Sequence, residues 1–349
     1  MKIKKLLALI GSVCLLLVLA VLPFMAACAP EEAPPAPEEV EWKIFIPCPP
    51  GMPMPFIYQW MNEQFEERYD GRLTLDIYTG GMLPYKEADL LTVISDGLVE
   101  MVDAANVHIE GQIDWIGVTA LPTIYPTSAT AEKLGDEIVK PFMDRELREH
   151  WNSFLLFQYT LAPSADILYC TEKITSLDDI KGWHIRAAPP SEHVILSELG
   201  AIPERIDFME VCVALERGTI DGAITSIESA GPAGWLGPCK WIHPWNICYV
   251  FEACIVNLDA FNALPKDLQE ALLIVGAEAE EYATQLCLDL ADEWWQKAEE
   301  AGVTVVPLSA SDRQRLTEAA AIVEEQWITD PARSDKAKEL YNLIKEAQQ

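Results

Sequence analysis

The amino-acid sequence predicts an α/β protein built of two lobes. With 349 residues, half of them apolar, the chain is long enough for two domains that each have a core. Short strand-like runs alternate with helical patterns, as in sheets covered by helices. A helical pattern from Pro265 to about Ala301 would extend roughly 55 Å, which is longer than one small domain. We therefore expect this helix to pass across both lobes.

Strand and helix patterns alternate through the first half of the chain. The stretch 72–78 alternates apolar and polar residues like a half-buried strand, whereas 56–69 repeats its apolar residues at helical spacing. Ser128 or Thr130 is expected to cap a following helix. The expected strands of this half are 42–46, 72–78, 99–105 and 154–159, and the expected helices are 56–69, 85–96 and 127–151.

The stretch 176–222 continues the alternation and predicts parallel strands. A lone arginine, Arg186, ends its first strand beside loops shaped by glycine and proline, which makes an anion site plausible. Around this stretch we expect strands at 166–170, 221–222, 254–257 and 303–307, and helices ending near 200, at 209–217, 265–301, 312–327 and 336–347. The expected lobes are 41–163 with 251–290, and 164–250 with 291–349.

The N-terminal segment has the pattern of an export signal. Residues 1–27 combine three lysines, an apolar run and a small-residue exit. Met25-Ala26-Ala27-Cys28 resembles a bacterial lipobox, so Cys28 is the expected lipidation site, and a plain transmembrane anchor is the alternative. Residues 28–40 are rich in proline and glutamate and are typical of a tether. Either alternative places the body outside the cytoplasm and at a membrane.

Composition excludes some functions. The net charge is −30, and it becomes −33 without residues 1–27, which carry Lys2, Lys4 and Lys5. Such a charge excludes nonspecific nucleic-acid binding as a main role. Seven of the nine cysteines follow Cys28, and none shows a metal-ligand spacing. We expect mostly buried free thiols, with one disulfide such as Cys239–Cys248 left open.

The stretch 176–222 resembles the solute-binding proteins of TRAP transporters. The family's lead, its Ile-Arg strand end, its Leu-Gly-Ala-x-Pro turn, its Phe-x-Glu step and its Asp-Gly close are all present. The matching residues are Leu177, Asp179, Ile180, Lys181, Gly182, Ile185, Arg186, Leu199, Gly200, Ala201, Pro203, Phe208, Glu210, Ala214, Leu215, Gly218, Asp221 and Gly222. The resemblance implies a two-lobed, periplasmic-binding-protein-like fold of type II, with hinge strands between the lobes. It also implies an extracytoplasmic receptor that passes a small carboxylate to membrane permease subunits.

The resemblance also implies roles for single residues. Arg186 matches the arginine that bridges the solute carboxylate, and its planar guanidinium suits two oxygens. Phe208 matches an aromatic residue of the family's cleft, with ordinary core packing as the alternative. Thr225 stands where members often carry an asparagine that contacts the ligand. Asn106, at the end of a predicted strand, is a further candidate polar contact.

Two departures from the family narrow the expected ligand. Asp166 stands near the place of a second arginine found in many members, which makes a dicarboxylate or a sugar acid less suitable. An organic monocarboxylate with an apolar or aromatic body fits the aromatic residues Trp241, Trp245 and Tyr249 better. Some members use a Glu-Trp pair with a metal after Asp-Gly, and Ile224-Thr225 lacks that pair. We therefore expect no metal there and no cofactor.

Two other functions remain open at this stage. The same fold could serve as a sensory receptor that feeds a signalling protein instead of a permease. An exported enzyme is the rival from a different class. The sequence contains five histidines and neither a GxSxG nor an HExxH motif, but its many acidic residues leave paired catalytic carboxylates possible.

Overall fold

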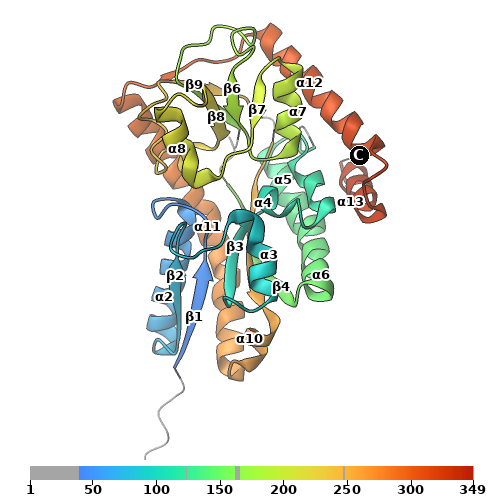
Figure 1. Cartoon of the computed structure of the whole chain (residues 1–349). Coiled ribbons are helices and arrows are strands. Elements are labelled where there is room, and N and C mark those ends of the chain that lie inside the picture. Colours follow the sequence, from blue (N-terminus) through green and yellow to red (C-terminus); the bar gives the residue numbers. More distant parts are fainter. Residues whose placement is uncertain (1–38, 123, 162–165, 247, 349) are drawn as a thin grey trace, which may run out of the picture. The chain divides into compact units, whose positions relative to one another are not determined.

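Two mixed β-sheets organise the part of the chain that the computed structural model describes, which comprises residues 39–122, 124–161, 166–246 and 248–348 (Figure 1). The first sheet has the order β2-β1-β3-β10-β4 and the second the order β11-β9-β5-β8-β6-β7. The strands of the first sheet are β1 (Val40–Phe45), β2 (Leu73–Tyr78), β3 (Met101–Ala105), β4 (Ser153–Thr160) and β10 (Phe251–Asn257). Those of the second are β5 (Ile167–Cys170), β6 (His184–Arg186), β7 (Ile202–Glu204), β8 (Gly222–Thr225), β9 (Trp241–Pro244) and β11 (Thr304–Val305).

The expected parallel pairing is confirmed within the stretch 176–222, where β6 pairs in parallel with both β7 and β8. Strands β1, β2 and β3 are also parallel. Strands β9 and β11 are parallel as well, whereas β10 runs antiparallel to β3 and β4, and β5 runs antiparallel to β8 and β9. Each sheet therefore contains one strand, β10 or β5, that runs opposite to both of its neighbours.

The helices of the first half follow the expected order with shifted ends. They are α2 (Pro53–Tyr69), η2 (Glu87–Asp89), α3 (Leu90–Ser95), α4 (Asn106–Ile109), η3 (Asp114–Ala120), α5 (Ser128–Leu134), the π-helical η4 (Gly135–Val139) and α6 (Lys140–His150). Helix α2 begins before the expected Phe56, because prolines fit the first helical turn. The expected helix 127–151 is interrupted at η4, and its cap is Thr127, whose side chain accepts from the Thr130 amide.

The helices of the second half include the long one. They are α7 (Pro190–Glu198), α8 (Phe208–Glu216), α9 (Ile227–Ala230), α10 (Leu258–Ala263), α11 (Lys266–Glu300), α12 (Ala310–Thr329) and α13 (Asp335–Glu346). Helix α11 contacts α2 and β4 beside the first sheet and α9 beside the second, so the expected long helix does serve both sheets. None of the helices in the described ranges is long and apolar enough to span a membrane.

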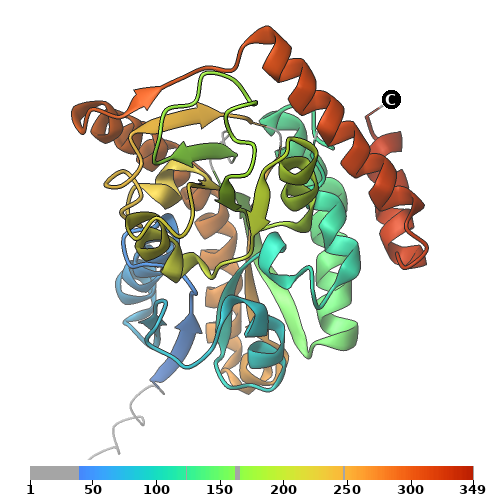
Figure 2. The same cartoon turned by 45° about the horizontal axis from the view of Figure 1, so that its top comes forward.

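The C-terminal helices connect the two sheets along one side (Figure 2). Helix α12 packs on α7 of the second sheet's layer, and α13 packs on η3 and η4 of the first. The Ser334 hydroxyl donates to the Asp114 carboxylate at 2.9 Å at this contact. The sequence placed residues 291–349 in the second lobe as a whole, and the packing of α13 does not follow that division. The physical reason for the docking of α13 is that this helix is amphipathic. Its buried residues Ala337, Leu340 and Ile344 need an apolar surface to pack against.

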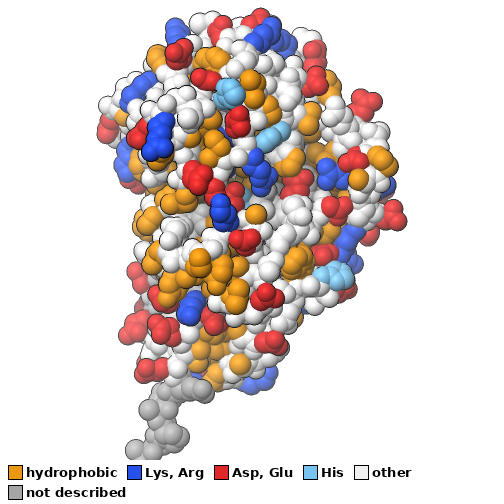
Figure 3. All heavy atoms as spheres, in the orientation of Figure 1, with side chains coloured by type: hydrophobic (Ala, Val, Ile, Leu, Met, Phe, Trp, Pro, Cys, Tyr) orange, Lys and Arg blue, Asp and Glu red, His pale blue; other side chains and the backbone are white. Residues whose placement is uncertain are grey.

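Charge is distributed over the surface without a single-sign field on the face shown in Figure 3. Acidic and basic side chains are interspersed there among polar and apolar ones. An extended basic stripe, which nucleic-acid binding would require, is not visible on this face.

Gly276 of α11 offers a test of the packing between the long helix and the first sheet. An alanine Cβ at this position would lie 2.6 Å from Leu156 Cγ. Alanine gains about 1 kcal/mol over glycine in a helix interior, but overpacking costs about 1–3 kcal/mol. We expect Gly276→Ala to lower the free energy of unfolding, measured by urea denaturation, by about 1 kcal/mol.

The matched control is Gly111→Ala, because a Cβ at Gly111 meets no atom within 4 Å. Its free energy of unfolding should stay within about 0.5 kcal/mol of the wild-type value. A Gly276→Ala variant that is more stable than the wild type would contradict this packing.

Candidate functional site

A cavity lies between the two sheets and is walled by both. Its empty volume is about 690 Å³ including its opening to solvent, which suits a small molecule. The apolar lining residues include Ile46, Met52, Met54, Val107, Leu161, Phe208, Ile224 and Val250. The polar lining residues include Asp103, His108, Asp166, Arg186, Glu192, Thr225, Ser226, Ser229 and Glu252.

Arg186 reaches this cavity from the end of β6 and is only 2% exposed. Its Nε donates to the Ile206 carbonyl at 3.2 Å and its Nη1 to the Ile224 carbonyl at 3.3 Å. Burial lowers the pKa of the guanidinium. Among the described residues, no carboxylate oxygen lies within 4.0 Å of its nitrogens. A buried cation without an ionic partner is a suitable binding group for an anion.

Phe208 and Thr225 lie on the same wall as Arg186, as the sequence predicted. Phe208 is the first residue of α8, and the centroid of its ring lies 5.6 Å from Arg186 Cζ. The same ring packs on Trp235 with centroids 5.2 Å apart, so it belongs both to the cavity wall and to the core. Thr225 ends β8 and is half-buried at the cavity.

Asn106 does not line this cavity. Its Nδ2 donates to the Thr119 hydroxyl at 2.6 Å, and its Oδ1 accepts from the Phe251 amide at 3.3 Å. Both ends of the amide are thus engaged inside the first sheet's layer, where it borders a separate small cavity. The strand-end argument identified the correct edge of the sheet but not the direction of this side chain.

The aromatic residues Trp241, Trp245 and Tyr249 also lie outside the cavity lining. Strand β9, which contains Trp241, is separated from β8 by β5. Trp245 is fully buried in the core. The Tyr249 ring packs edge-on against Tyr125, with centroids 6.3 Å apart. All three belong to or pack against one hydrophobic core cluster, so their density in the sequence reflects core packing and not a ligand wall.

Two acidic residues of the opposite wall were missed by the sequence reasoning. Asp103 lies on β3 and Glu252 on β10, and both are almost fully buried at the cavity. The hydroxyls of Tyr58 and Tyr159 donate to Asp103 Oδ2 at 2.5 and 3.1 Å. Burial raises the pKa of Asp103 to about 6 and that of Glu252 well above its usual value. In the sequence, the available signal for each of these two residues was a single acid within an otherwise mostly apolar strand.

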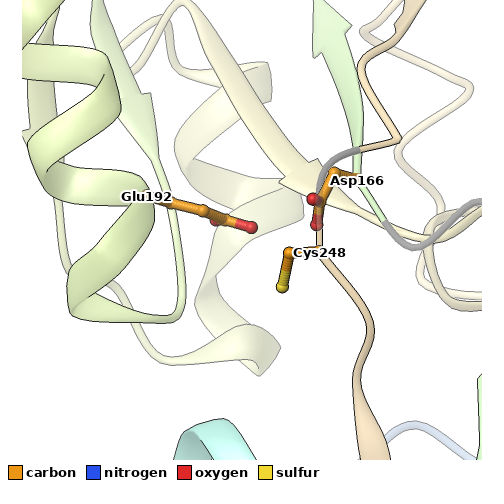
Figure 4. Close-up of side chains that lie close together, drawn as sticks. All are labelled: Asp166, Glu192 and Cys248. Carbon is orange, nitrogen blue, oxygen red and sulfur yellow. The ribbon is translucent and has the colours of Figure 1, made fainter. Parts of the chain in front are cut away.

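A second buried group gathers beside Arg186. Asp166, Glu192 and Cys248 place their ligand atoms within 4.8 Å of one another (Figure 4). Burial and the neighbouring Asp166 raise the pKa of Glu192, and burial raises that of the Cys248 thiol. These three are the described residues whose types and spacing could hold a metal ion. The raised pKa values of Glu192 and Cys248 favour their protonated forms, which are poor metal ligands.

The seven cysteines of the described chain are all free. The disulfide between Cys239 and Cys248 that the sequence left open is therefore not formed. Six of the seven are buried, which agrees with the expectation of mostly buried thiols. The expected lipidation site, Cys28, lies outside the described residues.

A cavity between two α/β layers, with a buried arginine in its wall, suits a protein that binds a small anionic solute. The sequence matches the family "Bacterial extracellular solute-binding protein, family 7" over residues 56–330, and the chain belongs to that family. The resemblance to TRAP solute receptors and the two-lobed periplasmic-binding-protein fold are thereby confirmed.

Individual relatives are distant in sequence and close in fold. The C4-dicarboxylate-binding periplasmic protein DctP of Rhodobacter capsulatus is 25% identical over 76% of this chain and 79% of its own length. DctP7 of Bordetella pertussis, a receptor that binds pyroglutamic acid, has a TM-score of 0.78 at 19% identity, covering 87% of this chain and 99% of its own. A Sulfitobacter receptor with bound β-D-galacturonate has a TM-score of 0.79 at 17% identity, covering 88% and 100%.

The raised pKa of Asp103 predicts a pH dependence of stability. The folded state holds a proton between the unfolded pKa of 3.8 and the folded pKa of about 6. The stability that this proton contributes is complete below pH of about 4 and is lost as the pH rises through about 6, with an upper limit of about 3 kcal/mol. Asp103→Asn should therefore show a smaller fall in the free energy of unfolding between those pH values.

The measurement is urea unfolding across this pH range for both proteins. Asp292→Asn is the control, because Asp292 is exposed on α11, and its profile should parallel that of the wild type. Parallel profiles for Asp103→Asn and the wild type would show that Asp103 does not titrate in this window.

Proposed function

We propose that this chain is the extracytoplasmic receptor of a TRAP transporter, and that it binds a small organic carboxylate at Arg186 and delivers it to membrane permease subunits. One observation carries the proposal. The guanidinium of Arg186 is buried in the cavity wall, and no carboxylate of the described chain lies within 4.0 Å of it. The ligand carboxylate supplies the missing anion.

The geometry around Arg186 supports a single carboxylate anchor. The guanidinium donates to two backbone carbonyls and packs on the Phe208 ring. Its remaining donors can therefore serve two carboxylate oxygens. Asp166, which stands near the place of a second arginine in many members, lies within the acidic group next to Glu192. A second carboxylate at this wall would meet acids instead of a cation.

The body of the ligand is bounded by apolar side chains. Met52, Met54, Val107 and Phe208 contribute to a lining that is mostly apolar. This supports a monocarboxylate with an apolar body, as expected from the sequence. Relatives with this fold bind pyroglutamic acid and sugar acids such as β-D-galacturonate, so a panel of candidate ligands includes these acids beside aliphatic and aromatic monocarboxylates.

Arg186→Met tests the anchor without changing the size of the side chain greatly. Removing a buried guanidinium that has no ionic partner should leave the ligand-free protein at least as stable as the wild type in thermal unfolding. The affinity for the best acid of the panel, measured by isothermal titration calorimetry, should fall about a hundredfold or more, because a buried charge pair is lost.

Arg217→Met is the matched control, since Arg217 is exposed at the end of α8. It should bind the same acid with unchanged affinity. Undiminished binding by Arg186→Met would show that the carboxylate is held elsewhere.

We also propose that lipid on Cys28 anchors the receptor, with residues 28–40 as the tether. This proposal is supported by the lipobox-like sequence Met25-Ala26-Ala27-Cys28. Cys28→Ser should move the protein from the membrane fraction to the soluble extracytoplasmic fraction when the chain is expressed in a bacterium. Cys212→Ser, a change at the half-buried thiol of the body, should stay with the membrane. Retention of Cys28→Ser at the membrane would favour a transmembrane anchor.

A further inference from the structure

The cavity carries opposite charges on its two walls. Arg186 belongs to the second sheet, and the acidic pair Asp103 and Glu252 belongs to the first. In the ladder between β3 and β10, Cys254 lies opposite Asp103 and Ala105 opposite Glu252. Since side chains two residues apart share a face, Asp103 and Glu252 are diagonal neighbours on one face, with Cα atoms about 7–8 Å apart across the ladder. Both line the cavity.

The two carboxylate oxygens of Asp103, in the acidic pair, have different surroundings. Tyr58 and Tyr159 both donate to Asp103 Oδ2. Asp103 Oδ1 is buried and accepts from no nitrogen or hydroxyl of the described chain, so a proton shared with the neighbouring Glu252 carboxyl is what serves it without a ligand. Across the described ranges, neither Asp103 nor Glu252 has a lysine, arginine or histidine nitrogen within 4.0 Å. A buried pair of acids that is held by a shared proton and has no counter-cation is costly to bury, and a cationic ligand group would complete it.

The protonation of the pair is consistent with this picture. Burial is the largest cause of the raised pKa values of Asp103 and Glu252, while the hydrogen bond between the two carboxyls lowers the pKa of Asp103 and raises that of Glu252. The neighbouring Tyr58, Tyr159, Cys48 and Cys254 also have raised pKa values, so they stay neutral and supply no counter-charge. The pair therefore holds a proton in place of a cation.

We propose that the ligand of this cavity is a zwitterion, whose carboxylate binds Arg186 and whose basic nitrogen binds between Asp103 and Glu252. The ligand class is an amino acid in which an apolar spacer separates the two charged ends. The proposal rests on the proposed function for the carboxylate end. It adds a second subsite, the acidic pair, at the opposite wall.

An ammonium group fits the acidic pair better than a hydroxyl does. A hydroxyl would satisfy Asp103 Oδ1 but would leave the buried negative charge without a counter-charge. An ammonium has three donors and a full positive charge, so it serves Oδ1 and Glu252 together. The apolar side chains of Met52, Met54 and Val107 in the lining match an apolar spacer between the two ends.

The other acidic group of the cavity does not serve this role. Glu192 lies close enough to Arg186 for each charge to shift the pKa of the other, and Asp166 lies next to Glu192. These acids therefore share a wall with the anchor. A ligand nitrogen placed there would lie beside the guanidinium that holds the carboxylate.

Matched ligand pairs test the acidic pair directly. Straight-chain ω-amino acids from β-alanine to 6-aminohexanoate are compared by titration calorimetry at neutral pH with the unsubstituted acids of equal length. At the best length, the amino acid should bind the wild type at least about tenfold more tightly than its unsubstituted partner. Asp103→Asn and Glu252→Gln, each nearly isosteric, should reduce that ratio of dissociation constants toward one.

Two outcomes would overturn the zwitterion proposal. One is that the amino acid binds no more tightly than the unsubstituted acid at any length, which includes a series in which no member binds. The other is a ratio that survives in both variants. The failure of the proposed function is separate, because it would show as Arg186-independent binding, or no binding, across the whole panel of sugar acids, pyroglutamate and monocarboxylates.

Discussion

The guanidinium of Arg186 is 2% exposed, and in the described chain it is fixed by two backbone carbonyls and the face of Phe208. Burying an ion in this way costs several kcal/mol unless an opposite charge joins it. Burial favours the protonated form of the nearby Glu192, and the carboxylates of Glu87 and Asp207 act on the guanidinium only from beyond 4.0 Å. In the proposed function, the carboxylate of the ligand supplies this opposite charge.

Strands of the two sheets supply the charged residues of the two cavity walls. The end of β6 delivers Arg186, and the neighbouring β8 delivers Thr225 to the same edge. The ladder of β3 and β10 delivers the acidic pair to the opposite wall. Helix α11 contacts elements of both layers, so the two walls are tied to one rigid element. A zwitterion that spans them would bridge the layers through its own charges.

Much of the fold follows from local sequence patterns, and the site follows only in part. Arg186 could be predicted because a strand end next to a Pro-Pro loop fixes its place. Phe208 could be predicted because it matches an aromatic residue of the cleft in the family that the sequence resembles. Asn106 and Trp245 could not be placed correctly, because side-chain direction depends on which layer packs over each strand. Asp103 and Glu252 meet only through a long-range antiparallel ladder between β3 and β10, and no local pattern reports that register. The interruption at η4 and the docking of α13 on η3 are likewise tertiary effects.

A crystal structure of the receptor with the solute that co-purifies from its native host would test the central claim most directly. The account predicts a carboxylate with both oxygens on the Arg186 guanidinium, in hydrogen-bonding distance and in the plane of its donors, with the solute enclosed between the two sheets. A solute bound with Arg186 turned away, or with an uncharged group against the guanidinium, would contradict the account.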